Sequence, residues 1–167
     1  MRPIATVWLV PLRAYVVVTT RGLYQHARCP LFSSLESLPS NTCLLIPPLP
    51  GRPDLSTVLT KLHIFRLTQF SKIIFLDADV LPIRPLSHLF TLPHDFSAVP
   101  DVGWPDIFNS GFMVLSPGED KFAELMALSK TKGSWDGADQ GLLNEWRGSS
   151  WNRLSFTYNT TPTAVYT

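Results

Sequence analysis

The stretch that most constrains the fold is Ser71–Arg84, which reads SKIIFLDADVLPIR. Lys72 to Leu76 is an apolar run of β-branched and aromatic residues without glycine or proline, a pattern typical of a strand buried on both faces of a parallel sheet. Asp77 and Asp79 follow at once, and their spacing places both side chains on one face wherever the backbone stays extended. Because open α/β sheets bind ligands beyond the carboxyl ends of their strands, the sequence predicts a binding site here.

The two carboxylates favour a metal site. Hard oxygen ligands, with room left for water and phosphate oxygens, suit Mg²⁺ or Mn²⁺. Such an ion neutralises the charge that grows on a departing diphosphate. The spacing of Asp77 and Asp79 is equally compatible with a solvated turn that carries two surface acids.

Composition narrows the class of protein. The 167 residues suffice for one domain with a hydrophobic core. A net charge of +1 gives no reason to expect nucleic acid or an acidic membrane surface as a partner. Apolar stretches are too short to span a bilayer, and no targeting segment is expected. Cys29 and Cys43 lack metal or redox spacing, which is typical of free thiols in a reducing compartment and predicts a cytoplasmic protein.

The local patterns predict alternating strands and helices, with an irregular, proline-rich region at residues 25–51. Ser116-Pro117-Gly118-Glu119 has the form of a capping box that starts a helix, and Gly133 is expected to end it. The predicted strands are Ala14–Thr20, Lys72–Leu76, Asp95–Val99 and Phe112–Leu115, with short β-leaning pieces at Phe156–Tyr158 and Thr163–Tyr166. The predicted helices are Asp54–Phe70, Pro85–Phe90, Ser116–Lys132 and a short one opened by Asp136–Gly141.

Several motifs then occur in one order between Arg52 and Tyr166. They are RPDL at 52–55, LTKLH at 59–63, LDAD at 76–79, GWPD and FNSG between 103 and 111, and DGADQG at 136–141. Together they closely resemble the glycogenin family of glycosyltransferase family 8, especially its fungal form. The resemblance implies an α/β, Rossmann-like GT-A fold with a mostly parallel sheet flanked by helices, here one partial domain over residues 1–167 with a shortened region at 25–51.

The resemblance also implies an activity. The family transfers glucose from UDP-glucose with retention, first to a tyrosine hydroxyl and then to a growing glucan that primes glycogen synthesis. It implies Mn²⁺ or Mg²⁺ as cofactor, a homodimer and glycogen synthase as a partner. The resemblance assigns Asp77 and Asp79 to the metal, Ala78 to the nucleoside, Arg52 and Lys61 to the donor, Asn109, Ser110, Asp136, Asp139 and Gln140 to glucose, and Tyr166 to the acceptor. Residues 14–24 are also similar to the family's first strand and uracil loop, which implies that Val18, Thr20 and Tyr24 lie at the nucleotide.

Asp139 is the residue that the resemblance places closest to the reacting carbon. It either stabilises an oxocarbenium-like centre or attacks it to form a covalent glucosyl intermediate, and the sequence does not choose between these. Lys61 adds positive charge near the diphosphate.

The chain departs from the family pattern at some positions. The family's third metal ligand, a histidine, has no counterpart, and the end just after Tyr166 suggests a shortened product. Ala138 replaces a glycine, which is a small change if its φ is negative. Two other interpretations therefore stay open: a catalytically impaired nucleotide-sugar binder or partner subunit, and a sister transferase with an external sugar or polyol acceptor.

Overall fold

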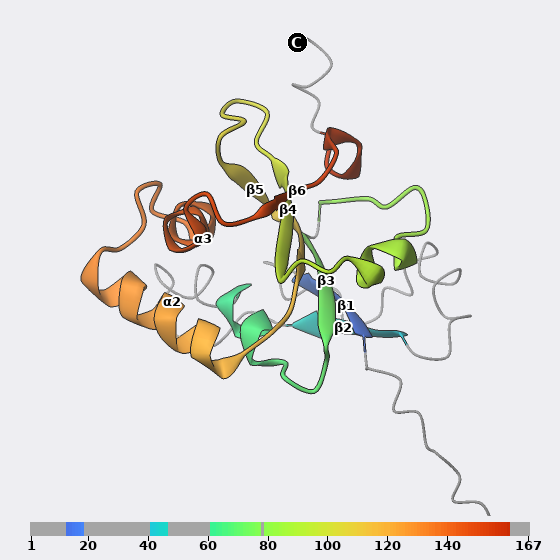
Figure 1. The fold of residues 1–167 in the computed structure, drawn as a ribbon, viewed down its shortest axis with the longest axis horizontal. Coiled ribbons are helices and arrows are strands. Elements are labelled where there is room, and N and C mark those ends of the chain that lie inside the picture. The colour runs from blue at the N-terminus through green and yellow to red at the C-terminus, as the bar shows by residue number, and fades with distance from the viewer. Residues whose placement is uncertain (1–12, 19–40, 47–60, 78, 161–167) are drawn as a thin grey trace, which may run out of the picture.

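The computed structural model describes the backbone of residues 13–18 and 41–46 and, in full, residues 61–77 and 79–160. The elements follow one another along the chain as Figure 1 shows. They are β1 (Arg13–Val18), β2 (Asn41–Ile46), the 3₁₀ turn η1 (His63–Arg66), β3 (Lys72–Asp77), the 3₁₀ turn η2 (Ser87–Thr91), β4 (Phe96–Pro100), β5 (Phe108–Leu115), α2 (Glu119–Thr131), α3 (Asp139–Arg147), β6 (Asn152–Arg153) and the 3₁₀ turn η3 (Phe156–Tyr158).

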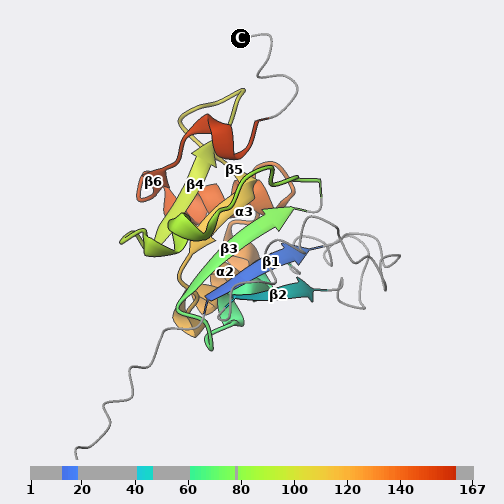
Figure 2. The same ribbon diagram turned by 90° about the vertical axis from the view of Figure 1, so that its right-hand side faces the viewer.

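The strands form one mixed sheet in the order β2-β1-β3-β5-β4-β6. β1 runs parallel to β2 and β3, as the three arrows in Figure 2 show, and β4 runs parallel to the short β6. β5 is antiparallel to both of its neighbours, β3 and β4. The register pairs Val18 with Asp77 at the carboxyl ends of β1 and β3. The predicted α/β class is confirmed. The carboxyl ends of the parallel strands β1 and β3 lie side by side, and Asp77 is the last residue of β3.

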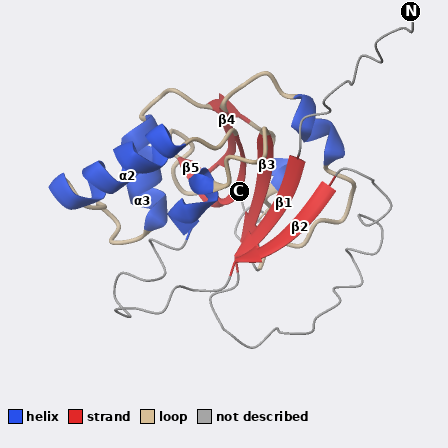
Figure 3. Ribbon diagram, turned by 90° about the horizontal axis from the view of Figure 1, so that it is seen from below, coloured by secondary structure: helices blue, strands red, loops and turns tan. Residues whose placement is uncertain are grey.

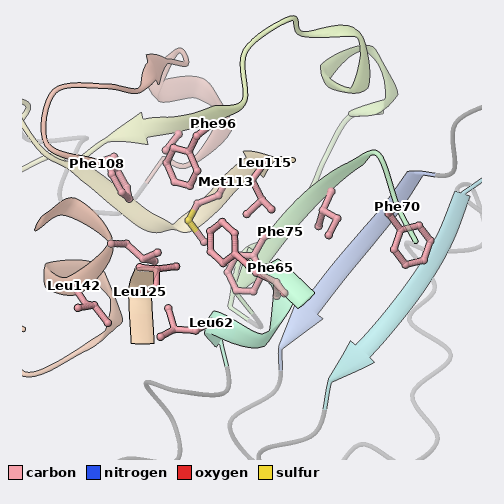
Figure 4. Close-up of a cluster of buried hydrophobic side chains, with 14 residues drawn as sticks. Leu62, Phe65, Phe70, Phe75, Phe96, Phe108, Met113, Leu115, Leu125 and Leu142 are labelled. Atoms are coloured by element: carbon pink, nitrogen blue, oxygen red, sulfur yellow. The ribbon is translucent and has the colours of Figure 1, made fainter. Parts of the chain in front are cut away.

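β3 is buried on both faces, as its sequence predicts. Ile73 and Phe75 belong to the core layer that contains residues of η1, α2 and α3, whereas Ile74 and Leu76 belong to a second layer on the opposite face with Leu89 and residues of η2. Figure 3 shows α2 and α3 together on one side of the strands. Figure 4 shows the first layer, whose labelled side chains include Phe65, Phe75, Phe96, Phe108, Met113, Leu115, Leu125 and Leu142.

An ion-pair group fastens both helices to the start of β4. Asp95 accepts hydrogen bonds from Lys121 Nζ in α2 at 2.6 Å and from Arg147 Nη2 in α3 at 3.0 Å. Burial opposes ionisation of Asp95, but the hydrogen bonds from Lys121 and Arg147 outweigh it and lower its pKa. The carboxylate therefore stays charged at neutral pH and holds the helices against the sheet edge.

Several predicted boundaries are wrong. The helix expected to reach Phe70 is helical at Lys61 and Leu62 but tightens into η1, and Leu67 has left the helical region. η2 replaces the helix expected at Pro85–Phe90, and η3 replaces the strand expected at Phe156–Tyr158, with the Ser155 hydroxyl accepting the Thr157 N–H at 3.3 Å. Within residues 25–51, where only short regular structure is expected, the structure describes the six-residue strand β2, which includes Cys43.

The capping-box prediction is also wrong, although the end of α2 is as expected. Ser116 N–H donates to Asp95 O at 2.9 Å, so Ser116 still belongs to the strand end and Gly118 becomes the N-cap residue. Gly133 has φ +72° and donates its N–H to Leu128 O at 3.2 Å, as a glycine that terminates a helix does. Within the described residues, no helix combines the length and apolar character needed to cross a bilayer.

Candidate active site

The candidate site is built around the Lys61 ammonium group. Its Nζ lies 3.1 Å from Asp77 Oδ1 and 2.6 Å from Asp139 Oδ2, and it donates to Ser110 Oγ at 3.2 Å. Lys61 is 7% exposed, so its charge is largely removed from water. A lysine this buried requires ionic partners. The sequence alone favours a solvated helix lysine, and only the family resemblance identified this position.

Asp77 closes β3 and enters the site from the sheet. The pKa of its carboxyl is raised, first because of burial and also because the Asp139 and Asp79 charges lie near, while Lys61 opposes the rise. Three carboxylates thus share one region with one ammonium group. Such a cluster of negative charge favours a cation.

Asp79 does not continue the strand. Val80 N–H donates to Asp77 O at 3.0 Å, so the chain turns directly after β3 and the extended backbone assumed for a shared face is absent. Asp79 is exposed. Its charge nevertheless contributes to the raised pKa of Asp77, which keeps the two acids within electrostatic reach of each other.

Ser110 lies in a part of β5 that is not paired with β4. The pairing shifts between Ala98 and Val99, whose partners are Met113 and Asn109, so residues 110–112 have no partner in β4. The buried Ser110 donates its hydroxyl to Asp139 Oδ2 at 2.7 Å. Asn109 and Ser110 therefore lie within a strand, not in the turn before one.

Gly111 keeps the backbone close to the carboxylates. A Cβ atom at this position would lie 2.9 Å from Asn109 Oδ1 and 3.3 Å from Asp77 Oδ2. A side chain here would require the ends of the Asn109 and Asp77 side chains to shift from their present positions.

The first turn of α3 supplies Asp139 and Gln140. Gln140 Oε1 accepts the Ser110 N–H at 3.1 Å. Further along α3, the buried Asn144 accepts the Phe108 N–H at 2.9 Å and donates to Phe108 O at 2.8 Å, which fixes the helix to β5. Ala138, the N-cap residue, has φ −127°, so alanine fits where the family has glycine.

Asp136 has a structural task at the start of α3. Its carboxylate accepts the Ala138 N–H at 2.8 Å and the Gly141 N–H at 2.9 Å. Burial would raise its pKa, but the hydrogen bonds from Ser134, Ala138 and Gly141 lower it. The exposed Asp136 thus caps the helix that carries Asp139, and its predicted contact with glucose stays a prediction.

Some predicted residues lie outside the described part of the chain. Val18 is placed by its backbone only, beside Asp77 in the register. The remaining predictions for the nucleotide, donor and acceptor concern residues that the structure does not describe, namely Thr20, Tyr24, Arg52, Ala78 and Tyr166.

Two residues of the site are absent from the sequence prediction. Asp101 accepts hydrogen bonds from Asn109 Nδ2 at 3.3 Å and Gln140 Nε2 at 3.1 Å. Asn159 donates to Asn109 Oδ1 at 2.9 Å. An acid two residues before Gly103 is a common turn pattern and was a usable signal for Asp101, whereas no local pattern marks Asn159.

Taken together, the site contains the buried Lys61 ammonium group, carboxylate oxygens, the Ser110 hydroxyl and the side-chain amides of Asn109 and Gln140. These groups suit a polar ligand that carries both negative charge and hydroxyl groups. Within the described residues, no three or more His, Cys, Asp or Glu side chains are grouped to hold a metal by themselves. An ion here would depend in part on oxygen atoms of the ligand or of water.

Comparison with known proteins identifies the family of this chain. The model of glycosyl transferase family 8 matches residues 52–166, which include the site described above. The chain belongs to glycosyl transferase family 8. It is 58% identical over 137 residues to a glycogenin of Cryptococcus neoformans var. grubii, covering 70% of this chain, and 52% identical over 151 residues to a glycogenin of Neurospora crassa, covering 90%.

The family 8 chain spans only part of these relatives. It covers 15% of the Cryptococcus protein and 21% of the Neurospora protein. Among solved structures, the glycosyltransferase GlyE of Streptococcus pneumoniae matches with a TM-score of 0.70 at 16% identity, over 94% of this chain and 48% of that one. This likeness shows that the two proteins share a fold.

Proposed function

We propose that this family 8 chain binds UDP-glucose together with a divalent cation and transfers the glucosyl group with retention of configuration. The observation that carries the proposal is the convergence of Asp77, Ser110 and Asp139 on Lys61 Nζ within 3.2 Å. The fungal glycogenins that this chain resembles support the choice of donor.

In this reaction the bond between the glucosyl C1 and the diphosphate oxygen breaks, and UDP leaves. A bond from C1 to an acceptor hydroxyl oxygen forms, and the hydroxyl proton is released. Lys61 places positive charge where the leaving group gains negative charge. Asp139 stabilises the cationic C1 centre or bonds to it transiently; a covalent adduct distinguishes the two routes.

Asp77 and Asp79 are the residues that would hold Mn²⁺ or Mg²⁺. The donor set fits a hard divalent ion, because both groups are carboxylates and the region already concentrates negative charge. When bound, the ion would supply charge neutralisation for the diphosphate. With Asp77 and Asp79 as its ligands among the described residues, such an ion would also need oxygen atoms of phosphate or water.

The acceptor and partners follow from the same family. We propose Tyr166 as the first acceptor, followed by a short glucan that primes glycogen synthesis in the cytoplasm. A tyrosine that accepts glucose across a subunit boundary calls for a homodimer, and glycogen synthase would extend the product.

A binding titration tests the proposal. UDP-glucose titrated into the protein with Mn²⁺ should bind, and Asp77→Asn should weaken that binding by about tenfold or more, since a metal ligand is lost. Lys130→Gln in the exposed part of α2 is the matched control and should leave the affinity unchanged. Equal affinity with and without Mn²⁺, or in Asp77→Asn and the unaltered protein, would contradict metal-assisted donor binding.

A separate measurement distinguishes transfer from binding alone. The unaltered protein should release UDP from UDP-glucose in the presence of Mn²⁺. Tight binding without UDP release would favour the impaired nucleotide-sugar binder. UDP release by Tyr166→Phe that depends on an added sugar or polyol, which receives the glucosyl group, would favour a transferase with an external acceptor.

A further inference from the structure

Asp101 joins three parts of the site through one carboxylate. It follows β4 directly, at the end of the sheet where β3 delivers Asp77. Asp101 Oδ1 accepts the N–H groups of Gly103 at 2.8 Å and Trp104 at 3.3 Å. Asp101 Oδ2 accepts Asn109 Nδ2 at 3.3 Å and Gln140 Nε2 at 3.1 Å. One side chain thus connects its own loop, β5 and α3.

The amides that Asp101 holds are fixed at both ends. The oxygen of Gln140 accepts the Ser110 N–H at 3.1 Å, and the oxygen of Asn109 accepts the Gly111 N–H at 2.9 Å. A flip of either amide would turn its carbonyl oxygen toward the Asp101 carboxylate. Two acceptors would then face each other, which is unfavourable. The Asp101 carboxylate therefore fixes the orientation of each amide, with the NH₂ group toward Asp101 and the carbonyl oxygen toward a backbone N–H of β5.

The Asp101 carboxyl group is ionised when it accepts these hydrogen bonds. Burial would raise its pKa, but hydrogen bonds from the Gly103 N–H, Gln140 and Asn109 outweigh that effect and lower the pKa. Hydrogen bonds to an ionised acceptor are stronger than those between neutral groups. A neutral amide at this position would place its NH₂ group either against both the Asn109 and Gln140 NH₂ groups or against the Gly103 and Trp104 N–H groups, so two contacts would become repulsive in either orientation.

We propose that Asp101 is a positioning residue, which orients the Asn109 and Gln140 amides to receive the hexose hydroxyls of the donor. The inference rests on the proposed function, since it assumes that these amides contact the sugar. Because Asp101 acts through these amides, its loss should weaken binding of the sugar part of the donor and leave binding of UDP unchanged. A general loosening of the fold would weaken both.

The test compares Asp101→Asn with the unaltered protein, using UDP-glucose and UDP as separate ligands with Mn²⁺ in titration calorimetry. UDP-glucose affinity should fall about tenfold and UDP affinity should stay within about twofold. Asp106→Asn, an exposed carboxylate of the same loop, is the control and should change neither affinity. A parallel loss of both affinities, or no loss of either, would overturn the positioning role.

A ligand-free measurement accompanies the titration. In ¹H–¹⁵N spectra, the side-chain NH₂ signals of Asn109 and Gln140 should shift in Asp101→Asn and stay unchanged in Asp106→Asn. Unchanged signals in a folded Asp101→Asn protein would contradict the proposal. If the unaltered protein binds UDP but not UDP-glucose, the proposed function is wrong and the inference falls with it; if only the variant comparison shows no difference, the positioning role alone is wrong.

Discussion

Lys61→Met should lower the rate of glucosyl transfer by about 10²- to 10³-fold, because it removes the positive charge beside the Asp77 and Asp139 carboxylates. The methionine retains much of the side-chain volume but removes the charge that lies 2.6 Å from Asp139 and 3.1 Å from Asp77. The two carboxylates would then repel each other without a cation between them. Steady-state release of UDP, measured with saturating UDP-glucose, reports the loss.

The same substitution should also cost stability. Breaking a buried ion pair by removing one partner costs about 3–5 kcal/mol, but the Asp77 and Asp139 side chains keep 34% and 21% exposure, so about 2 kcal/mol is expected after solvent screening. Lys61→Met combined with Asp139→Asn should recover part of this, because fewer uncompensated charges remain. Additive losses in denaturant titrations would contradict a direct interaction between Lys61 and Asp139.

Phe108→Ala should destabilise the fold by about 3–5 kcal/mol, the cost typical of emptying a large aromatic site in a core. Phe108 is fully buried, and its ring lies 5.1 Å from that of Phe96 and 5.3 Å from that of Trp151. Its backbone also pairs with the Asn144 amide, so collapse around the cavity would disturb the contact between β5 and α3. The midpoint of urea unfolding measures the change.

Phe156→Ala is the matched control for this core substitution. The Phe156 side chain is 45% exposed and should contribute much less, about 1 kcal/mol or below. A loss in Phe108→Ala no larger than in Phe156→Ala would show that the β5 end of the core is not close-packed.

The sequence predicted the parts of the fold that depend on local pattern. The β3 run follows from its continuous apolar sequence, and the end of α2 follows from Gly133. The start of α2 does not, because Ser116 is held by a strand hydrogen bond to Asp95, 21 residues earlier in the chain. Local capping rules cannot include a partner that only tertiary folding provides.

The site residues also divide into those that a local pattern predicts and those that depend on tertiary contacts. Asp77 was predictable from its place after a buried strand, whereas Lys61 has an ordinary helix context and became a candidate through family resemblance. Asp101 and Asn159 were missed because their roles consist of contacts with Asn109 across 8 and 50 residues of sequence. The register shift that leaves Ser110 unpaired with β4 depends on the contact between two strands, which no single-strand pattern encodes.

Glucosyl transfer at this site is measured most directly by the intact mass of the protein after incubation with UDP-glucose and Mn²⁺, beside Asp139→Asn and Tyr166→Phe. We expect a ladder of hexose increments on the unaltered protein and none on either variant. A folded, unaltered protein that gains no hexose and releases no UDP would contradict the proposal that this site transfers glucose.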